Sequence, residues 1–548
     1  MNRQIKRISI LIIIIGVTSI STLALSKSDK YRKIANSQRL INDVYKYLVT
    51  YYVDDIDIDK FTNATVSEMV NRMDPYTDYL IEDERDGLDL LTTGKYGGIG
   101  IQISRRDEAL TVIAPMEDTP AQRAGIIGGD VIIQINETTT SDLSLSQASK
   151  LIRGKKGTKV VLLIKRFGYE NTMEFELTRA EIRIKDVPYA EMLDEHIGYI
   201  RLTRFSSNSI IEMKSALNKL SNAHADAIIL DIRDNPGGLL HSAVEILDMF
   251  VDKDELLLST QGRIKGSSRT YYAKRKPLVG GDVKLAVLIN EGSASASEII
   301  AGVIQDLDRG LVIGKTSFGK GLVQSVVNLE DNKILKITTA KYYMPSGRLI
   351  QKPNYIDNDL IITNSNPDSI FTTSNGRIVI GSGGISPDIE IDDIQFQPLT
   401  VECFRRGAFF SFIQNRKHQY TSFTDVLYDD NLLDGFIQYI EEIEINIPVP
   451  GEMNFFAAVD EFKEDAEDIA ELESAFAMIE SYIEKRENAV FESEKDILYK
   501  NLIQEFAHAL EGDAGRFRER LKKDPTVIRA QEILREGSVY EQIFLAEK

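Results

Sequence analysis

The sequence predicts a multidomain α/β protein, in which a small β-rich domain and a mixed α/β core lie between two helical regions. The chain has 548 residues, of which 43% are hydrophobic, enough for several domains with their own cores. The apolar spacing changes from a helical period to short strands between glycine-rich turns, then to alternating strands and helices, and back. These changes predict a leader at 1–26, a helical region at 27–90, a β-rich domain at 91–180, an α/β core at 181–396 and an acidic helical region at 397–548.

The leader is a basic start followed by an apolar run. Arg3, Lys6 and Arg7 precede the uncharged residues 8–25. This pattern is typical of an export signal, either cleaved near Ser26 or retained as an inner-membrane anchor, with a buried core helix as the alternative. We therefore expect most of the chain to act on the periplasmic, extracytoplasmic side of the cell envelope.

The first helical region shows apolar residues at helical spacing, including Leu40, Val44 and Leu48. A turn at residues 73–77 closes it, because Asp-Pro favours turn formation. We therefore expect helices in this region.

The β-rich domain carries a glycine motif that suits recognition of a peptide C-terminus. Gly97, Gly98, Ile99 and Gly100 form a loop that enters a strand. Glycines let backbone N–H groups converge on a carboxylate, and a neighbouring strand edge can pair with an extended peptide. A tight turn is the alternative for such a loop alone. With the signature at 119–126, the domain resembles a PDZ domain with Gly97 to Gly100 as its carboxylate-binding loop.

Three segments of the α/β core combine a strand with a glycine- or serine-rich turn. A strand at 227–230 leads to residues 231–238, whose final two glycines precede a helix. Free N–H groups at a helix start suit an oxyanion. A second strand at 284–289 leads to residues 293–298, and a third segment at 314–321 precedes an alternating strand.

Ser295 and Lys320 point to serine–lysine chemistry when they are taken together. Alone, Ser295 fits a capping box with Glu298, and a lone lysine is usually solvated. A lysine accepts the serine proton only when neutral, so desolvation must lower its pKa from about 10.4. Apolar neighbours that would supply this desolvation are Phe318, Leu322 and Val323.

Composition argues against other chemistries. Asp and Glu number 84 and Lys and Arg 65, a formal net charge of −19, which disfavours nucleic acid as a partner. The single cysteine, Cys403, cannot form an intramolecular disulfide, and the five histidines are scattered without metal-ligand spacing. We therefore expect no metal, no cofactor and no histidine-based triad.

Four motifs together resemble the carboxyl-terminal processing peptidases, also called tail-specific proteases. They are D-x-R-x-N-P-G-G at 231–238, S-A-S-A-S-E at 293–298, F-G-K-G at 318–321 and Y-Y-M-P-S-G-R at 342–348. The resemblance covers roughly residues 40 to 395.

The resemblance implies a catalytic role for each central residue. Ser295 would be the nucleophile and Lys320 the general base, and Gln324 would orient the lysine. On an alternating strand Lys320 and Gln324 would share a face. Oxyanion donors would be the backbone N–H groups of Ala296 and of either Gly237 or Gly238.

Three further positions follow from the same resemblance. Asp306 would support the site, with a surface salt bridge as the alternative. Arg153 would relay peptide binding to the core, unless it is simply solvated. Met344 replaces the threonine that is usual in the family, and we expect it to change a wall of the substrate groove more than the chemistry.

These residues predict a serine endopeptidase of the cell envelope that captures protein or peptide substrates by a free, apolar C-terminus through the PDZ domain and cleaves them with the Ser/Lys dyad. A catalytically silent PDZ-containing scaffold is the alternative. The S-x-x-K pattern at 317–320 lacks the companion motifs of penicillin-binding proteins, and a P-loop around Lys315 fails because Arg309 stands where its first glycine belongs.

The acidic region at 397–548 has three possible roles, because its helical stripes do not distinguish packing on the core, dimerisation and gating of access. The sequence also leaves open three further interactions: an envelope adaptor protein, a homo-oligomer, and membrane contact through a retained leader.

Overall fold

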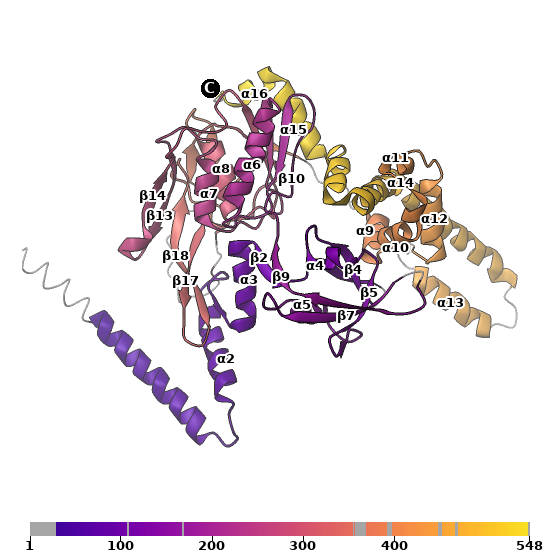
Figure 1. The fold of residues 1–548 in the computed structure, drawn as a ribbon, viewed down its shortest axis with the longest axis horizontal. Helices are drawn as coiled ribbons and strands as arrows, with labels where there is room; N and C mark the ends of the chain where they lie inside the picture. The colour runs from indigo at the N-terminus through magenta and orange to yellow at the C-terminus, as the bar shows by residue number, and fades with distance from the viewer. Residues whose placement is uncertain are drawn as a thin grey trace, which may run out of the picture. The chain divides into compact units, whose positions relative to one another are not determined.

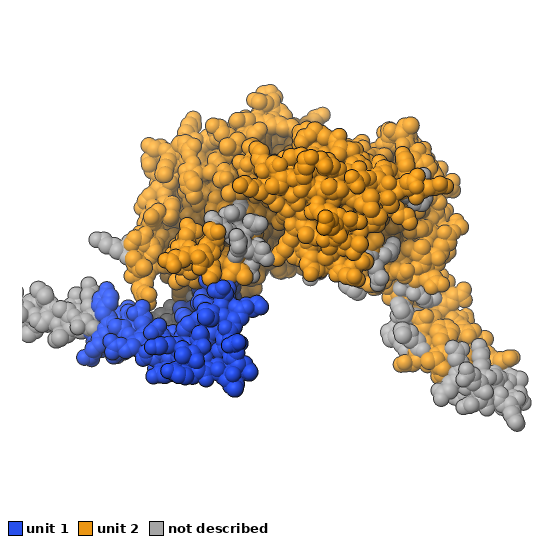
Figure 2. Space-filling model, turned by 60° about the horizontal axis from the view of Figure 1, so that its bottom comes forward, with its two compact units in different colours: residues 1–79, 358–361 blue, residues 80–357, 362–548 orange. Residues whose placement is uncertain are grey.

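The computed structural model describes residues 29–106, 109–166, 169–353, 356, 369–391, 397–445, 447, 452–465 and 470–545. The chain forms two compact units, one of residues 1–79 and 358–361 and the other of residues 80–357 and 362–548 (Figure 2). The predicted leader at 1–26 lies outside the described residues. Among the described helices, none has both the length and the apolarity to span a membrane.

The first unit is helical, as predicted. Residues 29–51 form one helix and α2 (Ile58–Asn71) the next. Tyr45 of the first helix packs on Phe61 of the second, with 5.6 Å between ring centroids, and its hydroxyl lies 2.8 Å from the hydroxyl of Thr62. Aromatic packing therefore joins the two helices.

The second unit begins with the PDZ-like domain, an antiparallel sheet of order β3-β4-β5-β7-β8 with β6 beside β5. Its core contains Ile99, Val112, Ile132 and, from α5, Ala148. Among the described strands β3 pairs only with β4, so its other edge is open. The elements up to the end of this domain are β1 (Asp78–Leu80), α3 (Glu82–Thr93), β2 (Lys95–Gly98), β3 (Ile101–Arg106), β4 (Ala109–Pro115), α4 (Pro120–Arg123), β5 (Val131–Ile135), β6 (Thr138–Thr139), α5 (Leu145–Ile152), β7 (Lys159–Lys165), β8 (Met173–Thr178) and β9 (Ala180–Arg183).

The α/β core is built on a six-stranded sheet of order β10-β11-β12-β15-β16-β21, parallel from β11 to β21 with β10 antiparallel at one edge. A second, antiparallel sheet contains β13, β14, β17 and β18. The elements are β10 (Tyr189–Met192), β11 (Ile197–Arg201), α6 (Ser209–Asn222), β12 (Ala227–Asp231), α7 (Leu240–Leu247), β13 (Leu256–Gly262), η1 (Lys265–Ser267), β14 (Arg269–Tyr272), β15 (Lys284–Ile289), α8 (Ala296–Asp306), β16 (Leu311–Gly314), β17 (Leu322–Asn328), β18 (Ile334–Tyr343), β19 (Ile370–Thr372), β20 (Ile378–Ile380) and β21 (Ile389–Glu390).

Both faces of the parallel sheet are buried, which explains its uninterrupted apolar strands. On β12, Ile228 and Leu230 contact the cluster formed with α6, α7 and α8, whereas Ala227 and Ile229 contact the C-terminal segment. Figure 1 shows α6, α7 and α8 gathered over the core, with α15 on the side of β10. The alternation of side chains along each strand thus separates two apolar layers.

The predicted C-terminal region divides into two parts. Phe409, Phe412, Phe436 and Phe506 centre the apolar core of a helical domain. α14 is interrupted at Gly512, and beyond it the chain returns to the parallel sheet. The elements are α9 (Pro398–Arg405), α10 (Ala408–Arg416), η2 (Lys417–Gln419), α11 (Phe423–Leu427), α12 (Leu432–Glu442), α13 (Glu452–Asp465), α14 (Ala470–Leu521), α15 (Pro525–Arg535) and α16 (Gly537–Ile543).

Candidate active site

The predicted nucleophile, Ser295, lies on a strained turn between β15 and α8. Its φ of 55° and ψ of −110° fall where residues other than glycine rarely lie. Such strain persists where surrounding contacts fix the backbone. Here the Ser295 N–H donates to the buried carboxylate of Glu298 at 2.8 Å. Every residue of α8 is buried, so the turn is presented by a helix enclosed in the core.

Asn235 connects the glycine loop at 231–238 to residues 293–297, which carry Ser295 and are called the serine turn. Its buried side chain donates to the Leu202 carbonyl at 2.9 Å and accepts the Gly237 N–H at 3.0 Å. Its backbone carbonyl accepts the Ala294 N–H at 3.0 Å and the Ser297 hydroxyl at 2.8 Å. The glycine loop and the serine turn therefore form one hydrogen-bonded structure.

Gly237 is the residue of the glycine loop that packs against Ser295. Its φ is 98°, and a Cβ at this position would lie 2.9 Å from the Ser295 Cβ, so no side chain fits. The Gly237 N–H is already bound by Asn235. Within the described residues, the N–H groups of Gly238 and Ala296 donate no hydrogen bond. These two groups are therefore available to an oxyanion.

The predicted base, Lys320, is half-buried in the loop between β16 and β17. Glu298 links it to the predicted nucleophile, because the same carboxylate oxygen accepts the N–H of Ser295 and, at 2.9 Å, the N–H of Lys320. Its other oxygen accepts the Gly319 N–H and the Ser317 hydroxyl, each at 2.6 Å. Burial raises the pKa of Glu298, although these hydrogen bonds lower it. One buried side chain thus holds the backbones of both residues.

Tyr342 is a second link between the same two residues. Its buried hydroxyl lies 3.3 Å from the Ser295 carbonyl oxygen and also hydrogen-bonds the Lys320 carbonyl. Glu298 therefore binds the N–H groups of Ser295 and Lys320, and Tyr342 binds their carbonyl groups.

Three residues of this network had no predicted role in it. Glu298 was interpreted only as half of a capping box, although S-x-x-E was visible in the sequence. Asn235 and Tyr342 lie inside motifs already recognised. Their positions in D-x-R-x-N-P-G-G and Y-Y-M-P-S-G-R were the signals that could have found them.

Gln324 does not share a regular strand face with Lys320, contrary to prediction. β17 begins at Leu322, and its pairing with β18 shifts register between Val323 and Gln324. The irregularity breaks the two-residue period. The half-buried Gln324 amide nitrogen lies 3.4 Å from the Thr338 hydroxyl.

Asp306 forms a buried ion pair, so the surface salt bridge considered from the sequence is wrong. It is 2% exposed and lies 2.7 Å from the guanidinium of Arg348. It also accepts the Ser346 N–H at 3.0 Å. Burial raises the pKa of Asp306, against the lowering effect of Arg348. The pair joins the end of α8 to the turn after β18.

Met344 forms no wall of a groove, contrary to expectation. It is 2% exposed and belongs to the apolar core. A Cβ added to Gly302 of α8 would come within 2.9 Å of its sulfur. Met344 therefore packs against α8 from inside the core.

The predicted carboxylate-binding loop starts within a strand. Gly97 and Gly98 belong to β2, which pairs with β9, and a Cβ on Gly97 would lie 2.1 Å from the Gly154 carbonyl oxygen. Ile99 is fully buried, and Gly100, with φ of 77°, turns the chain into β3. The glycine segment thus leads directly to the strand with the open edge.

Arg153 lies beside this segment. Its guanidinium carbon is 4.8 Å from the ring centroid of Tyr96, the residue before Gly97. This distance is that of a cation–π contact. Arg153 is therefore held against the entry strand of the domain and is not fully solvated.

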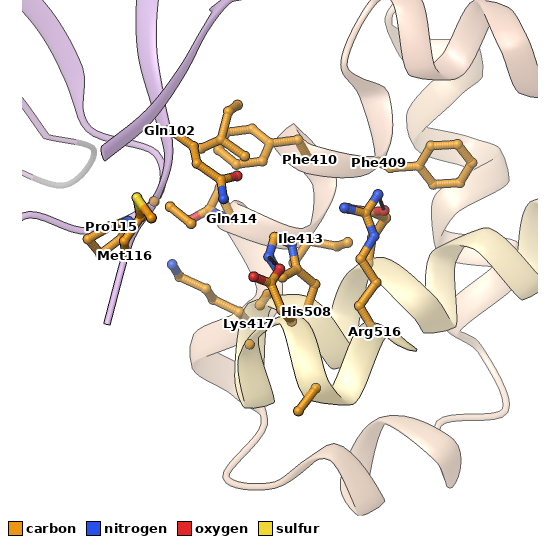
Figure 3. Close-up of a pocket in the computed structure, with 18 of the residues that line it drawn as sticks. Gln102, Pro115, Met116, Phe409, Phe410, Ile413, Gln414, Lys417, His508 and Arg516 are labelled. Atoms are coloured by element: carbon orange, nitrogen blue, oxygen red, sulfur yellow. Dashed lines mark hydrogen bonds and ion pairs between the residues drawn. The ribbon is translucent and has the colours of Figure 1, made fainter. Parts of the chain in front are cut away.

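A cavity of about 550 Å³ lies between the PDZ-like domain and the C-terminal helices. Figure 3 shows Pro115 and Met116 on one side and Phe410, Lys417 and His508 on the other. Neither Ser295 nor Lys320 lines it. The cavity is therefore separate from the predicted nucleophile and base.

Comparison with known proteins gives three family matches. Residues 196–362 match Peptidase family S41, residues 111–166 match a PDZ domain, and residues 399–534 match the C-terminal helical domain of a probable PDZ-protease. The first two matches lie within the α/β core and the PDZ-like domain.

The alignments with named relatives cover about three quarters of each relative's length. A carboxy-terminal-processing protease of Bartonella bacilliformis is 35% identical over 330 residues, 60% of this chain and 74% of that protein. The carboxy-terminal processing protease CtpA of Bacillus subtilis is 32% identical over 359 residues, 64% and 76%. A solved photosystem II D1 C-terminal processing protease is 29% identical with a TM-score of 0.35, covering 63% of this chain and 85% of its own. By sequence similarity the chain belongs to the carboxy-terminal processing proteases of Peptidase family S41, serine-type peptidases with a PDZ domain.

Proposed function

We propose that this chain cleaves proteins near their free C-termini with Ser295 as nucleophile and Lys320 as general base. The observation that carries the proposal is the shared support of these residues. Glu298 binds the N–H of both, and the Tyr342 hydroxyl lies against the carbonyl of both. Two residues distant in sequence are held in fixed relation by groups that are themselves buried, as a catalytic pair requires.

The reaction follows from the groups at this site. Ser295 attacks the scissile carbonyl as neutral Lys320 accepts its proton, and the backbone N–H groups of Gly238 and Ala296 bind the oxyanion. Protonated Lys320 then gives the proton to the leaving amine. Neutral Lys320 next accepts a proton from the water that attacks the acyl-enzyme and returns it to the Ser295 oxygen. This releases the substrate with its new C-terminus. Gly238 is preferred to Gly237 as donor because the Gly237 N–H is already bound.

Two other residues have supporting roles in the proposal. Gln324 would orient the Lys320 amine; this role rests on the sequence resemblance, because the register shift before Gln324 removes the argument from a shared strand face. Asp306 acts through Arg348 by fixing the end of α8 against the following turn.

Substrate recognition is assigned to the PDZ domain. The open edge of β3 would pair with an extended tail, and the loop from Gly97 to Gly100 would receive its carboxylate. The solved PDZ domain of a Vibrio cholerae carboxy-terminal protease is a peptide complex; it is 26% identical, with a TM-score of 0.16, and covers 16% of this chain and 99% of its own. Arg153 would relay tail binding to the core, a role that its contact with Tyr96 supports.

Several aspects of function stay predictions from the sequence alone. These are action in the cell envelope, an adaptor protein, homo-oligomers and membrane contact. The silent scaffold is the competing function, and the retained Ser295 and Lys320 disfavour it.

The test uses one unfolded protein in two forms, one ending in apolar residues and the other in charged residues. Cleavage of each form is measured over time by intact-mass analysis. Ser295→Ala and Lys320→Ala should each abolish cleavage, whereas Lys315→Ala, a lysine of the same loop, should retain it. Tail binding without cleavage by the unaltered chain would favour the scaffold. Cleavage by Ser295→Ala would show that the nucleophile lies elsewhere.

A further inference from the structure

The C-terminal segment, residues 521–545, completes the α/β core. Val527, Ile533 and Leu534 pack against the face of the parallel sheet that α6, α7 and α8 leave uncovered. At the end of the segment the Tyr540 hydroxyl accepts the Leu285 N–H at 3.1 Å. The segment is thus part of the same folded body as the serine turn.

One residue of this segment contacts the loop that carries the proposed oxyanion donor. The Asp524 carboxylate accepts two hydrogen bonds from the Arg233 guanidinium, at 2.9 and 3.1 Å. The same carboxylate accepts the Thr526 and Val527 N–H groups at the start of α15, at 3.0 and 3.2 Å. Asp524 therefore fixes Arg233 to the first turn of a helix that packs on the sheet.

Arg233 is held from its other side by a buried acid. Its guanidinium binds Asp231 at 2.6 to 3.1 Å, and Arg201 and Tyr199 bind the same carboxylate at 2.7 and 2.6 Å. Burial alone would raise the pKa of Asp231, but Arg233 and Arg201 hold it well below its usual value. Arg233 is 14% exposed at its side chain and Asp524 8%, so water competes little for these bonds.

The residues beside Arg233 are hydrogen-bonded to the serine turn. Asp234 follows with φ of 53°, and Asn235 then binds the serine turn through Ala294 and Ser297. The carbonyl of Ile232, the residue before Arg233, accepts the Ser293 hydroxyl at 2.9 Å. The backbone on both sides of Arg233 is therefore bound to the serine turn, and Arg233 belongs to the same loop as Gly237 and Gly238.

We propose that Asp524 is a positioning residue for catalysis: by holding Arg233 it sets the glycine loop so that the Gly238 N–H meets the oxyanion. The C-terminal region of this chain thereby completes the active site from outside the motifs that mark the family resemblance. This inference rests on the proposed function, because it needs Ser295 and a backbone oxyanion donor. It concerns the rate of the chemical step and leaves tail capture by the PDZ domain unchanged.

The test is Asp524→Asn in the full chain, which keeps the shape and one helix-capping oxygen but removes the charge. We expect kcat for the apolar-tailed substrate to fall roughly 10- to 100-fold, approaching the effect of losing one oxyanion donor, with KM changed less than threefold. Labelling of Ser295 by a fluorophosphonate should slow in parallel. Tyr540→Phe is the matched control, since it removes a buried hydrogen bond between the same segment and β15; it should lower thermal stability and leave kcat within about twofold.

Two results would overturn the role of Asp524. One is an unchanged kcat in Asp524→Asn, and the other is an equal loss of kcat in Tyr540→Phe, which would mean general destabilisation. If Asp524→Asn does not fold, Asp524→Glu is measured instead, and it must lower kcat without raising KM. Ser295→Ala is assayed in parallel: cleavage that survives there overturns the catalytic assignment itself, whereas loss there with normal Asp524→Asn turnover rejects only the present inference.

Discussion

Glu298→Gln tests whether one buried carboxylate holds the two proposed catalytic residues together. Glu298 accepts four hydrogen bonds, from the N–H groups of Ser295, Gly319 and Lys320 and from the Ser317 hydroxyl. Glutamine keeps one acceptor oxygen and replaces the other with an NH₂ group, which cannot accept. Whichever way the amide turns, two of the four donors lose their partner.

The size of the effect follows from these contacts. Two hydrogen bonds to a charged acceptor are worth about 3–6 kcal/mol together. Part of this loss is offset, because burial raises the pKa of Glu298 and a neutral amide avoids the cost of burying a charge. We expect a net disturbance of about 2–4 kcal/mol. If this free energy is lost from the transition state alone, kcat decreases roughly 30- to 1,000-fold, because each 1.36 kcal/mol corresponds to a tenfold change in rate.

The assay is the initial rate of cleavage of the apolar-tailed substrate, with thermal unfolding measured in parallel. Glu212→Gln is the matched control, because Glu212 also has a pKa raised by burial and accepts two backbone N–H groups, those of Asp186 and Val187, at 2.7 and 2.8 Å. It should affect stability and leave kcat nearly unchanged. Turnover of Glu298→Gln within threefold of the unaltered chain would refute the reasoning.

Three other predictions test neighbouring parts of the structure. Gly237→Ala should lower kcat at least about 100-fold, because a Cβ there would lie 2.9 Å from that of Ser295; normal turnover would mean that the glycine loop lies elsewhere during catalysis. Asp306→Asn should destabilise the fold by about 3–5 kcal/mol in denaturant unfolding, since it leaves Arg348 charged and buried; a loss below 1 kcal/mol would argue against the ion pair. Burial raises the pKa of Cys403 to about 12, so only about one thiol in 10,000 is ionised at pH 8, and maleimide labelling should wait for unfolding; fast labelling of the folded chain would contradict this burial.

The turns that carry the proposed catalytic residues could be predicted from sequence because each is local. Ser295 precedes a helix, Lys320 precedes a strand, and Gly237 and Gly238 precede another helix, so each turn is visible in a few consecutive residues. Their convergence depends on contacts across the fold. Glu298 illustrates the limit, because its capping pattern is local, whereas its bonds to residues 317–320 join it to the loop that follows β16, a strand paired with β15.

Sequence reasoning failed where burial on all sides removes the pattern. α8 has no exposed residue, so no apolar stripe tells which side Asp306 occupies, and a surface ion pair was as reasonable as a buried one. The motif around Met344 predicts a wall of the substrate groove, but its side chain enters the core. The bulge before Gln324 has no sequence signal, so strand alternation alone predicts a shared face with Lys320 that the structure does not form.

The C-terminal region shows why the α/β core cannot be treated as a complete peptidase in this chain. A parallel sheet is stable only when both faces are covered, and Ile229, Leu288 and Ile313 lie on the face that residues 521–545 cover. Truncation after residue 396 would expose this face together with Arg233, deprived of Asp524. We therefore expect the truncated chain to aggregate during size-exclusion chromatography and to lack activity. A soluble truncated form with normal turnover would show that the sheet and the glycine loop hold their geometry without the C-terminal region.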